Sequence, residues 1–172
     1  MHAYDSTTIE HEGHSITVSW HYDEGLREPW KENDGHGPVS EWTTRDKQAG
    51  ELVLCKDGRS KRFYDFAEAC RIAKRDGWDS QPFNKGQESK RQQAAKAARA
   101  DFEYLRAWCN DEWHWSYYTV TIEGMDYDES CGGIESDSQA EIEQEALADA
   151  KAWLEQELAE SEAMAARDIL TA

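Results

Sequence analysis

Two segments of the chain alternate between apolar and polar residues, as a half-buried strand requires. They are HSITVSWHY, residues 14–22, and WSYYTVTIE, residues 115–123. The apolar faces consist of Ile16, Val18, Trp20 and Tyr22 in the first segment, and of Tyr118, Val120 and Ile122 in the second. Two shorter strands are predicted at about 51–56 and 61–64, on either side of a Lys-Asp-Gly-Arg turn.

Three helices are predicted from apolar residues at helical spacing and from capping signals. A short helix covers 66–76 and begins after Asp65, which is a good capping residue. A longer helix covers about 87–112, and a last one covers about 137–166, with Ser136 as its cap. The residues expected to face inward are Ala69, Ile72 and Ala73, then Ala94, Ala98, Phe102, Leu105 and Cys109, then Leu147, Ala150, Leu154 and Leu158.

These elements predict an α+β fold: a small, mainly antiparallel sheet of about four strands, with one short and two long helices. With 172 residues the chain fits a single domain, in which residues 1–135 form an α+β core and 136–172 an acidic helix packed on it. The aperiodic segment 25–50 is expected to be an ordered loop of that core. Only 38% of the residues are hydrophobic, so the 8 Trp, 7 Tyr and 4 Phe residues must supply much of the buried surface.

The cysteines and the apolar runs indicate a cytoplasmic protein. The four cysteines lie far apart without a Cys-x-x-Cys pair, and no apolar signal segment follows Met1. No apolar run approaches the roughly 20 residues that span a bilayer, so neither a transmembrane helix nor a membrane partner is expected.

Charge changes this picture more than composition does. The net charge of −17 disfavours direct binding to nucleic acid and favours a basic protein partner. Residues 59–99 hold 5 acidic and 11 basic side chains, whereas residues 123–172 hold 15 acidic and 2 basic ones. The cations of 59–99 are expected to pair with the acidic segments of the chain, or to form the second pole of an interaction surface.

Acidic residues of the last predicted helix form a candidate binding surface. Glu141, Glu145 and Asp149 recur every four residues and therefore share a face. Like charges at this spacing destabilise an isolated helix by about 0.2–0.5 kcal/mol per pair. The stripe is either solvated surface or a row of carboxylates that imitates nucleic-acid phosphates in the cationic groove of a partner. The residues assigned to partner binding are Glu141, Glu145, Asp149, Glu155, Glu157 and Glu160.

The loop PWKENDGHGPVSEW, residues 29–42, offers the other candidate site. Its side chains of the types that metals accept as ligands are Glu32, Asp34, His36 and Glu41. No spacing typical of a zinc hydrolase, a P-loop or an EF-hand is present, so a structural loop pinned by its two tryptophans is favoured, and no cofactor is expected. One alternative is a loop that contacts another protein. The other is a metal or catalytic site, for which the candidate residues are Asp34, His36, His14 and His21.

Over roughly residues 16–78, the chain resembles small uncharacterised proteins encoded by tailed bacteriophages. The segments that carry the resemblance are WHYDEGLREPWKENDGHGPVSEWTTRDK and GELVLCKDGRSKRFYDFAEACRIAKRDGW. The acidic C-terminal part is similar, in composition only, to the DNA-mimic inhibitors of phages and plasmids. The resemblance to phage proteins implies the cytoplasm of an infected bacterium as the setting, and assigns no catalytic residues. The likeness to DNA mimics implies a target among the restriction, CRISPR or other nucleic-acid-handling machinery of the host.

The leading hypothesis is therefore a non-enzymatic inhibitor that acts by DNA mimicry, alone or as a homodimer. It would bind a host nucleic-acid-binding protein or complex without contacting nucleic acid itself. Two alternatives stay open at this point. One is a metal-dependent hydrolase or nuclease that uses the Asp-Gly-His-Gly loop, and the other is a structural or assembly protein of a phage.

Overall fold

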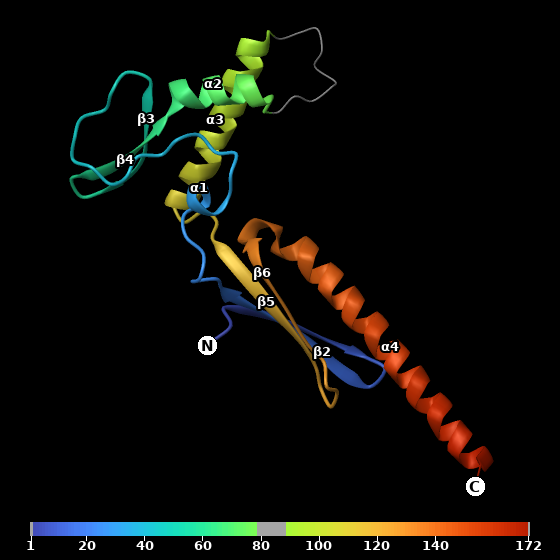
Figure 1. Ribbon diagram of the computed structural model, residues 1–172. Helices are drawn as coiled ribbons and strands as arrows, with labels where there is room; N and C mark the ends of the chain where they lie inside the picture. The colour runs from blue at the N-terminus through green and yellow to red at the C-terminus, as the bar shows by residue number, and fades with distance from the viewer. Residues whose placement is uncertain (1, 79–88, 172) are drawn as a thin grey trace. The chain divides into compact units, whose positions relative to one another are not determined.

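The computed structural model describes residues 2–78 and 89–171 (Figure 1). The chain divides into two compact units. Unit 1 comprises residues 1–26 and 114–172, and unit 2 comprises residues 27–113. Unit 2 is therefore inserted between two parts of unit 1 that are distant in the sequence.

Unit 1 is built on a four-stranded antiparallel sheet with the strand order β1-β2-β5-β6. Its strands are β1 (Asp5–His11), β2 (His14–Tyr22), β5 (Trp115–Ile122) and β6 (Asp128–Glu135). The two central strands, β2 and β5, are the alternating segments of the sequence, and Val18 pairs directly with Val120. A 3-10 turn (Ser136–Ser138) leads from β6 into the helix α4 (Gln139–Thr171).

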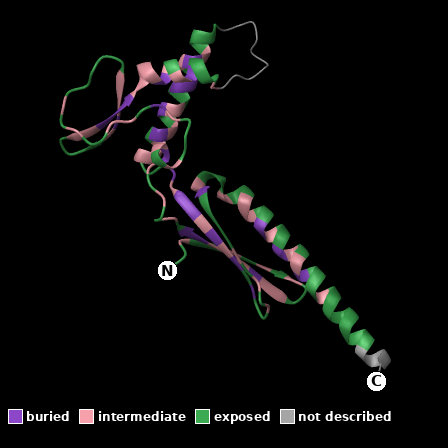
Figure 2. Cartoon of the chain, in the orientation of Figure 1, coloured by how far each residue is buried: buried purple, intermediate pink, exposed green. Residues whose placement is uncertain are grey.

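Helix α4 packs on one face of the central strands and forms the core of unit 1 with them (Figure 2). The buried residues of this core are Ile16, Val18, Trp20, Tyr118, Val120, Ile122, Ile134, Ala146, Ala150 and Leu154. The indole N–H of Trp20 donates to Glu143 Oε2 at 2.9 Å, so the buried ring keeps an acceptor. Residues 159–167 are exposed, which shows that α4 continues past its contact with the sheet.

Unit 2 packs a β-hairpin against two helices. Its elements are α1 (Pro29–Glu32), β3 (Glu51–Asp57), β4 (Ser60–Asp65), α2 (Phe66–Asp76) and α3 (Lys90–Cys109). Local signals set the helix ends: Asp65 accepts the N–H of Glu68, and Gly77 ends α2 with a φ of 73°. Ser89 and Gln92 form a capping box at the start of α3. The buried core consists of Leu54, Tyr64, Ala69, Ala98, Phe102 and Leu105.

The loop 29–42 closes around one buried arginine. The guanidinium of Arg62 lies 5.2 Å from the ring centre of Trp30 and 4.8 Å from that of Trp42, so both tryptophans of the loop stack on the same cation. Its Nη2 donates to Glu28 Oε1 at 2.6 Å. Because Arg62 is only 6% exposed, its charge is held by these partners rather than by water.

Two contacts bring the ends of the insertion together. Within unit 2, the rings of Trp30 and Trp108 meet edge to face at 5.6 Å, which places α1 beside the end of α3. Within unit 1, the N–H of Asp23 donates to the carbonyl of Trp115 at 3.0 Å. The chain therefore leaves the sheet and re-enters it at neighbouring positions.

The structure confirms the predicted α+β class, with one difference in how the strands are grouped. The four predicted strands do not share a sheet, because the two shorter ones form the separate β3–β4 hairpin. The strands β1 and β6 complete the main sheet and were not predicted. Both are edge strands, and their sequences DSTTIEH and DESCGGIE hold few apolar residues and, in β6, two glycines.

The helix boundaries and the domain division differ in detail from the prediction. Ser136, expected to cap the last helix, lies in the 3-10 turn, where its Oγ accepts the N–H of His114 at 3.0 Å. Helix α3 begins at Lys90, and residues 87 and 88 of the predicted helix lie outside the described part of the chain. The two units do not coincide with the expected division at residue 135, and a single domain overall stays a prediction.

The substitution Arg62→Ala should lower the free energy of unfolding by about 3 kcal/mol. It removes both aromatic contacts and leaves half-buried Glu28 with only Lys31, whose Nζ lies 3.5 Å from Oε2. Arg59→Ala in the same hairpin is the matched control, since Arg59 is exposed, and it should change stability by about 0.5 kcal/mol or less. Chemical denaturation of both variants measures the difference. Equal effects would show that the stacked arginine does not stabilise the loop.

Candidate functional site

The net negative charge of the protein belongs entirely to unit 1. Unit 1 holds 20 acidic and 2 basic side chains, a net charge of −18, and unit 2 holds 16 acidic and 17 basic ones, a net charge of +1. The two basic residues of unit 1, Lys151 and Arg167, both belong to α4. The fold therefore separates charge more sharply than the linear sequence does, because it joins the acidic residues of β1 and its turn to those of the C-terminal part.

The six carboxylates predicted to bind a partner all lie on α4 and are all exposed: Glu141, Glu145, Asp149, Glu155, Glu157 and Glu160. Two of them have hydrogen-bond partners. Glu155 Oε1 lies 2.8 Å from His11 Nε2, and Glu160 accepts from Gln156 at 2.9 Å. Among the described residues, none of the six forms an ion pair with a lysine or an arginine. Their charge is therefore displayed to solvent.

Five of the six share one broad side of the helix. At 3.6 residues per turn, an arc of roughly 140° contains Glu141, Glu145, Asp149, Glu155 and Glu160. Glu157 lies about 60° beyond this arc. It is on the same side of the helix as Ala150 and Leu154, which are buried against the sheet one to two turns before it. The predicted face therefore holds for five residues, and Glu157 is a separate exposed carboxylate.

The negative field of these residues reaches the sheet. Burial, followed by the nearby negative charges that include Glu129, Asp149 and Glu145, raises the pKa of Tyr118. Burial, a hydrogen bond to Glu129 and the charges of Glu129 and Asp149 likewise raise the pKa of Tyr127. Both phenols are therefore harder to ionise than in water, chiefly because they are buried, and the carboxylates of β6 and α4 add to the effect.

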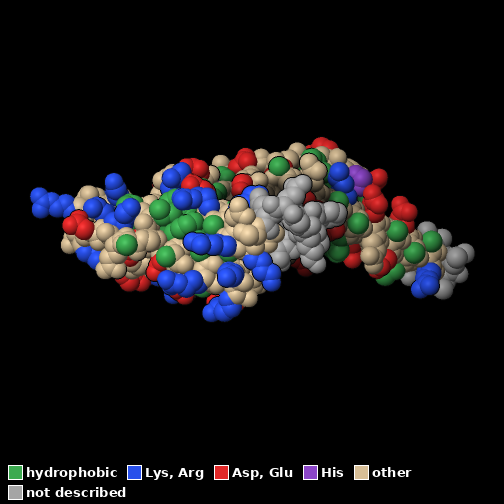
Figure 3. All heavy atoms as spheres, turned by 90° about the horizontal axis from the view of Figure 1, so that it is seen from above, with side chains coloured by type: hydrophobic (Ala, Val, Ile, Leu, Met, Phe, Trp, Pro, Cys, Tyr) green, Lys and Arg blue, Asp and Glu red, His purple; other side chains and the backbone are tan. Residues whose placement is uncertain are grey.

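Several cations of unit 2 form ion pairs within that unit. Ion pairs join Arg45 to Glu51, Arg62 to Glu28, Arg71 to Glu68, Arg75 to Asp76 and Arg106 to Glu103. The cations of 59–99 were expected to pair with the acidic segments of the chain. Arg62 does pair with Glu28 of the acidic segment 1–58, whereas Arg71 and Arg75 pair with carboxylates within 59–99. Lys and Arg side chains also surround a hydrophobic patch on the face of unit 2 that carries α2 and α3 (Figure 3).

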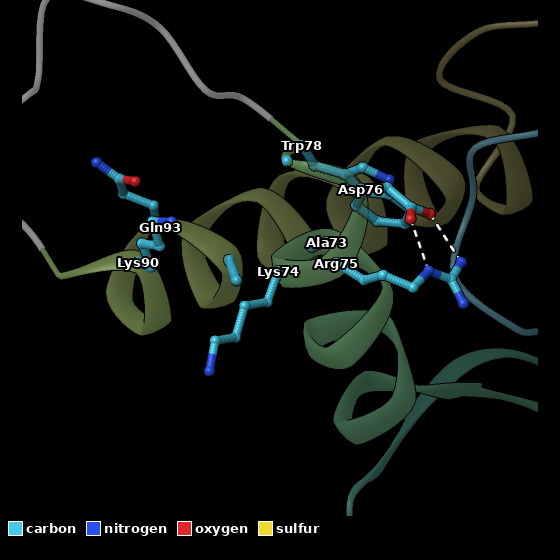
Figure 4. A pocket seen from close by; sticks show the side chains of 9 residues that line it. Ala73, Lys74, Arg75, Asp76, Trp78, Lys90 and Gln93 are labelled. Atoms are coloured by element: carbon cyan, nitrogen blue, oxygen red, sulfur yellow. Dashed lines mark hydrogen bonds and ion pairs between the residues drawn. The ribbon is translucent and has the colours of Figure 1, made fainter.

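A hollow of about 280 Å³ lies at the end of α2, and its lining includes the basic residues Lys74, Arg75 and Lys90. Figure 4 shows that these side chains do not converge on a common point. Arg75 turns towards Asp76, with its Nε 2.6 Å from Oδ1, while Lys74 extends in another direction. The arginine is already neutralised, so the hollow lacks the convergent donors that an anion site needs.

The Asp-Gly-His-Gly loop is braced by an aspartate of α3. His36 Nδ1 lies 2.6 Å from Asp101 Oδ1, while the N–H of Gly37 and the hydroxyl of Tyr64 donate to Asp101 Oδ2 at 2.8 and 2.7 Å. Because a carboxylate only accepts, this contact places a proton on Nδ1 of His36. The His36 ring also stacks on Tyr104, with ring centres 5.6 Å apart. One buried acceptor therefore ties the loop to the helix.

The proposed metal ligands do not gather. Asp34 is exposed, and His36 is engaged with Asp101. His14 lies in β2 of unit 1 with its Nδ1 2.9 Å from the carbonyl of Glu123, and His21, also in β2, stacks on a tyrosine of β5. In the part of the chain that the structure describes, no group of three or more His, Cys, Asp or Glu side chains could hold a metal ion.

Sequence reasoning missed Asp101, although a signal was present. Asp101 follows Ala98 by three residues and precedes Leu105 by four, so it lies within the apolar face predicted for this helix. A charged residue among buried positions needs a partner, and here the loop supplies a histidine, a backbone N–H and a tyrosine. Asp101 and His36 are paired as the Asp and His of a catalytic triad are, but the other contacts of Asp101, to a backbone N–H and a tyrosine hydroxyl, are those of a structural brace.

Comparison of the chain with protein-family models, curated proteins and solved structures found no match in any of the three. No helix in the described residues combines the length and the apolar character that crossing a membrane requires. The residues themselves must therefore carry any assignment of function.

Replacing Glu145 with Gln should stabilise the protein by about 0.4–1 kcal/mol at low ionic strength, because it removes the i,i+4 repulsions with Glu141 and with Asp149. Glu155→Gln is the matched control on the same helix: Glu155 has Lys151 four residues before it, so this change should not stabilise. Urea denaturation at low and high salt measures both. A gain for Glu145→Gln that does not shrink in high salt would contradict the electrostatic explanation.

Asp101→Ala should lower the free energy of unfolding by about 2–3 kcal/mol, because it leaves the N–H of Gly37 and the hydroxyl of Tyr64 without their charged acceptor. Glu103→Ala, two residues away, removes only an exposed ion pair with Arg106 and should cost about 0.5 kcal/mol or less. Thermal and chemical unfolding measure the two costs. If they are the same, Asp101 is not the brace of the loop.

Proposed function

We propose that the protein is a non-enzymatic inhibitor whose unit 1 occupies the cationic groove of a host nucleic-acid-binding complex of the restriction or CRISPR type. The observation that carries the proposal is the charge of that unit, with 20 acidic side chains against 2 basic ones. Attraction between such a surface and a basic groove is long-ranged and speeds association.

The spacing of the carboxylates supports a partner that grips a phosphate backbone. Residues four positions apart in a helix are separated by about 6 Å along its axis. One strand of duplex DNA carries a charge about every 3.4 Å along its axis. The row of Glu141, Glu145 and Asp149 thus carries roughly half as many negative charges per unit length as one DNA strand. The acidic residues of the sheet edges must supply the other charges.

A solvated surface is the competing explanation, and the distribution of charge favours mimicry. A requirement for solubility is met by net charge at any position of the chain, including unit 2. Here unit 1 carries a net charge of −18 and unit 2 a net charge of +1, so unit 1 holds more than the whole net negative charge of the protein. The acidic face of α4 also retains like-charge neighbours that oppose helix formation, which a surface selected for stability alone would replace with pairs of opposite sign.

Reversing three charges on α4 tests the proposal. In the variant Glu145→Lys, Asp149→Lys and Glu160→Lys, the three positions lie within roughly 60° of one another around the helix. The matched control is Asp34→Lys, Asp46→Lys and Asp57→Lys, which makes the same change in net charge at exposed positions of unit 2. The wild-type protein is used to capture partners from a bacterial lysate. These partners should be nucleic-acid-binding proteins, and adding duplex DNA should displace them from the protein.

The α4 variant should bind those partners about tenfold or more weakly, with a shallower dependence of affinity on salt, whereas the control should bind as the wild type does. Circular dichroism establishes that both variants are folded. Partners that DNA does not displace, or an equal loss of affinity in both variants, would exclude mimicry by α4.

A further inference from the structure

Two cysteines of unit 2 that are far apart in the sequence meet in the fold. Cys55 lies in β3 and Cys109 is the last residue of α3. Each thiol shifts the pKa of the other, and both are free and only partly buried. Cys109 packs against the buried cluster that contains Leu54, the residue before Cys55. The pair is therefore in contact and within reach of solvent.

A β-bulge creates this contact. Up to Val53 the strands pair in one register, in which Val53 lies opposite Phe63, and after the bulge Cys55 lies opposite Arg62. Without the extra residue, Cys55 would face Lys61 instead, on the other side of the hairpin. The side on which Arg62 lies is the side that packs on α3, because Tyr64, two residues along, donates its hydroxyl to a carbonyl of that helix.

The surroundings of the pair favour a thiolate on Cys55. The hydrogen bond from Cys109 and the charge and backbone N–H of Arg62 outweigh burial and the opposing charge of Glu28, and they lower the pKa of Cys55 to about 7. The same hydrogen bond, followed by burial, raises the pKa of Cys109. One thiol is thus poised as a nucleophile and its neighbour stays protonated until it is needed.

We propose that Cys55 and Cys109 form a dithiol that is converted into an intramolecular disulfide by exchange with a small disulfide such as oxidised glutathione. The Cys55 thiolate attacks one sulfur of the small disulfide, breaks its S–S bond and releases one thiolate, which leaves a mixed disulfide on Cys55. Cys109 then loses its proton to the released thiolate and attacks the sulfur of Cys55. The second small thiolate departs and takes a proton from water. In sum, two protein thiols are oxidised and one small disulfide is reduced to two thiols.

The other two cysteines serve as internal controls. Burial raises the pKa of Cys70 in α2, which makes it a poor nucleophile. Cys131 is exposed in β6 of unit 1 and provides a reference for an unassisted thiol. Neither belongs to the pair that the bulge assembles.

To test the proposal, the wild-type protein is oxidised with oxidised glutathione and its free thiols are then alkylated. The protein is digested without reduction, and the peptides are identified by mass spectrometry. The expected product is a linked peptide pair that contains Cys55 and Cys109, with Cys70 alkylated. The midpoint of thermal unfolding should rise by about 5 °C or more, and a thiol reductant should reverse the rise. In Cys109→Ser, glutathione should stay attached to Cys55, whereas Cys70→Ser should form the same linked pair as the wild type.

The proposal is wrong if the linked peptides contain Cys70 or Cys131, or if glutathione accumulates on Cys55 of the wild type without formation of the internal bond. It is also wrong if Cys55 is alkylated no faster than Cys131 at pH 7. The wild-type measurement decides these outcomes by itself, so the result does not depend on whether the serine variants fold.

Discussion

The contact between the apolar side of α4 and the strands β2 and β5 is the interaction on which the acidic unit depends. Unit 1 carries a net charge of −18, so folding gathers like charges that the unfolded chain would keep apart. Burial of Ala150, Leu154 and the residues of the sheet beneath them must offset that repulsion. Because the apolar stripe occupies one side of the helix, five of its carboxylates are left on the other. The packing that folds the unit therefore also decides where its charge is displayed.

The two candidate sites of the sequence differ in what the fold does with them. The residues of the Asp-Gly-His-Gly loop resemble metal ligands by type, but the structure uses His36 and Gly37 as partners of Asp101 and uses the flanking tryptophans as partners of Arg62. Polar side chains that converge on protein partners have little capacity left for a ligand. The carboxylates of α4 are the opposite case, since the described residues give them few partners of their own.

Much of the fold follows from local sequence. Alternation identifies β2 and β5, and Asp65 caps the helix that was predicted to follow it. The edge strands β1 and β6 could not be predicted, because an edge strand buries little and its sequence need not alternate. Contacts between residues that are distant in the sequence could not be predicted either. Nothing near Asp101 indicates that it binds His36, and nothing near Cys55 indicates that it lies beside Cys109. The separation of charge between units could be recognised only once the fold showed that residues 1–26 belong with residues 114–172.

The insertion of unit 2 between β2 and β5 has a consequence for how the chain reaches its folded state. The central strands of the sheet are neighbours in space but lie on either side of residues 27–113, so their pairing closes a long loop at an entropic cost that grows with its length. The edge-to-face contact of Trp30 with Trp108 joins the two ends of that loop from within. Once unit 2 is folded, the ends of β2 and β5 should be held close together, so pairing of these strands should cost less loop-closure entropy. We therefore expect the insertion to fold before the acidic unit does.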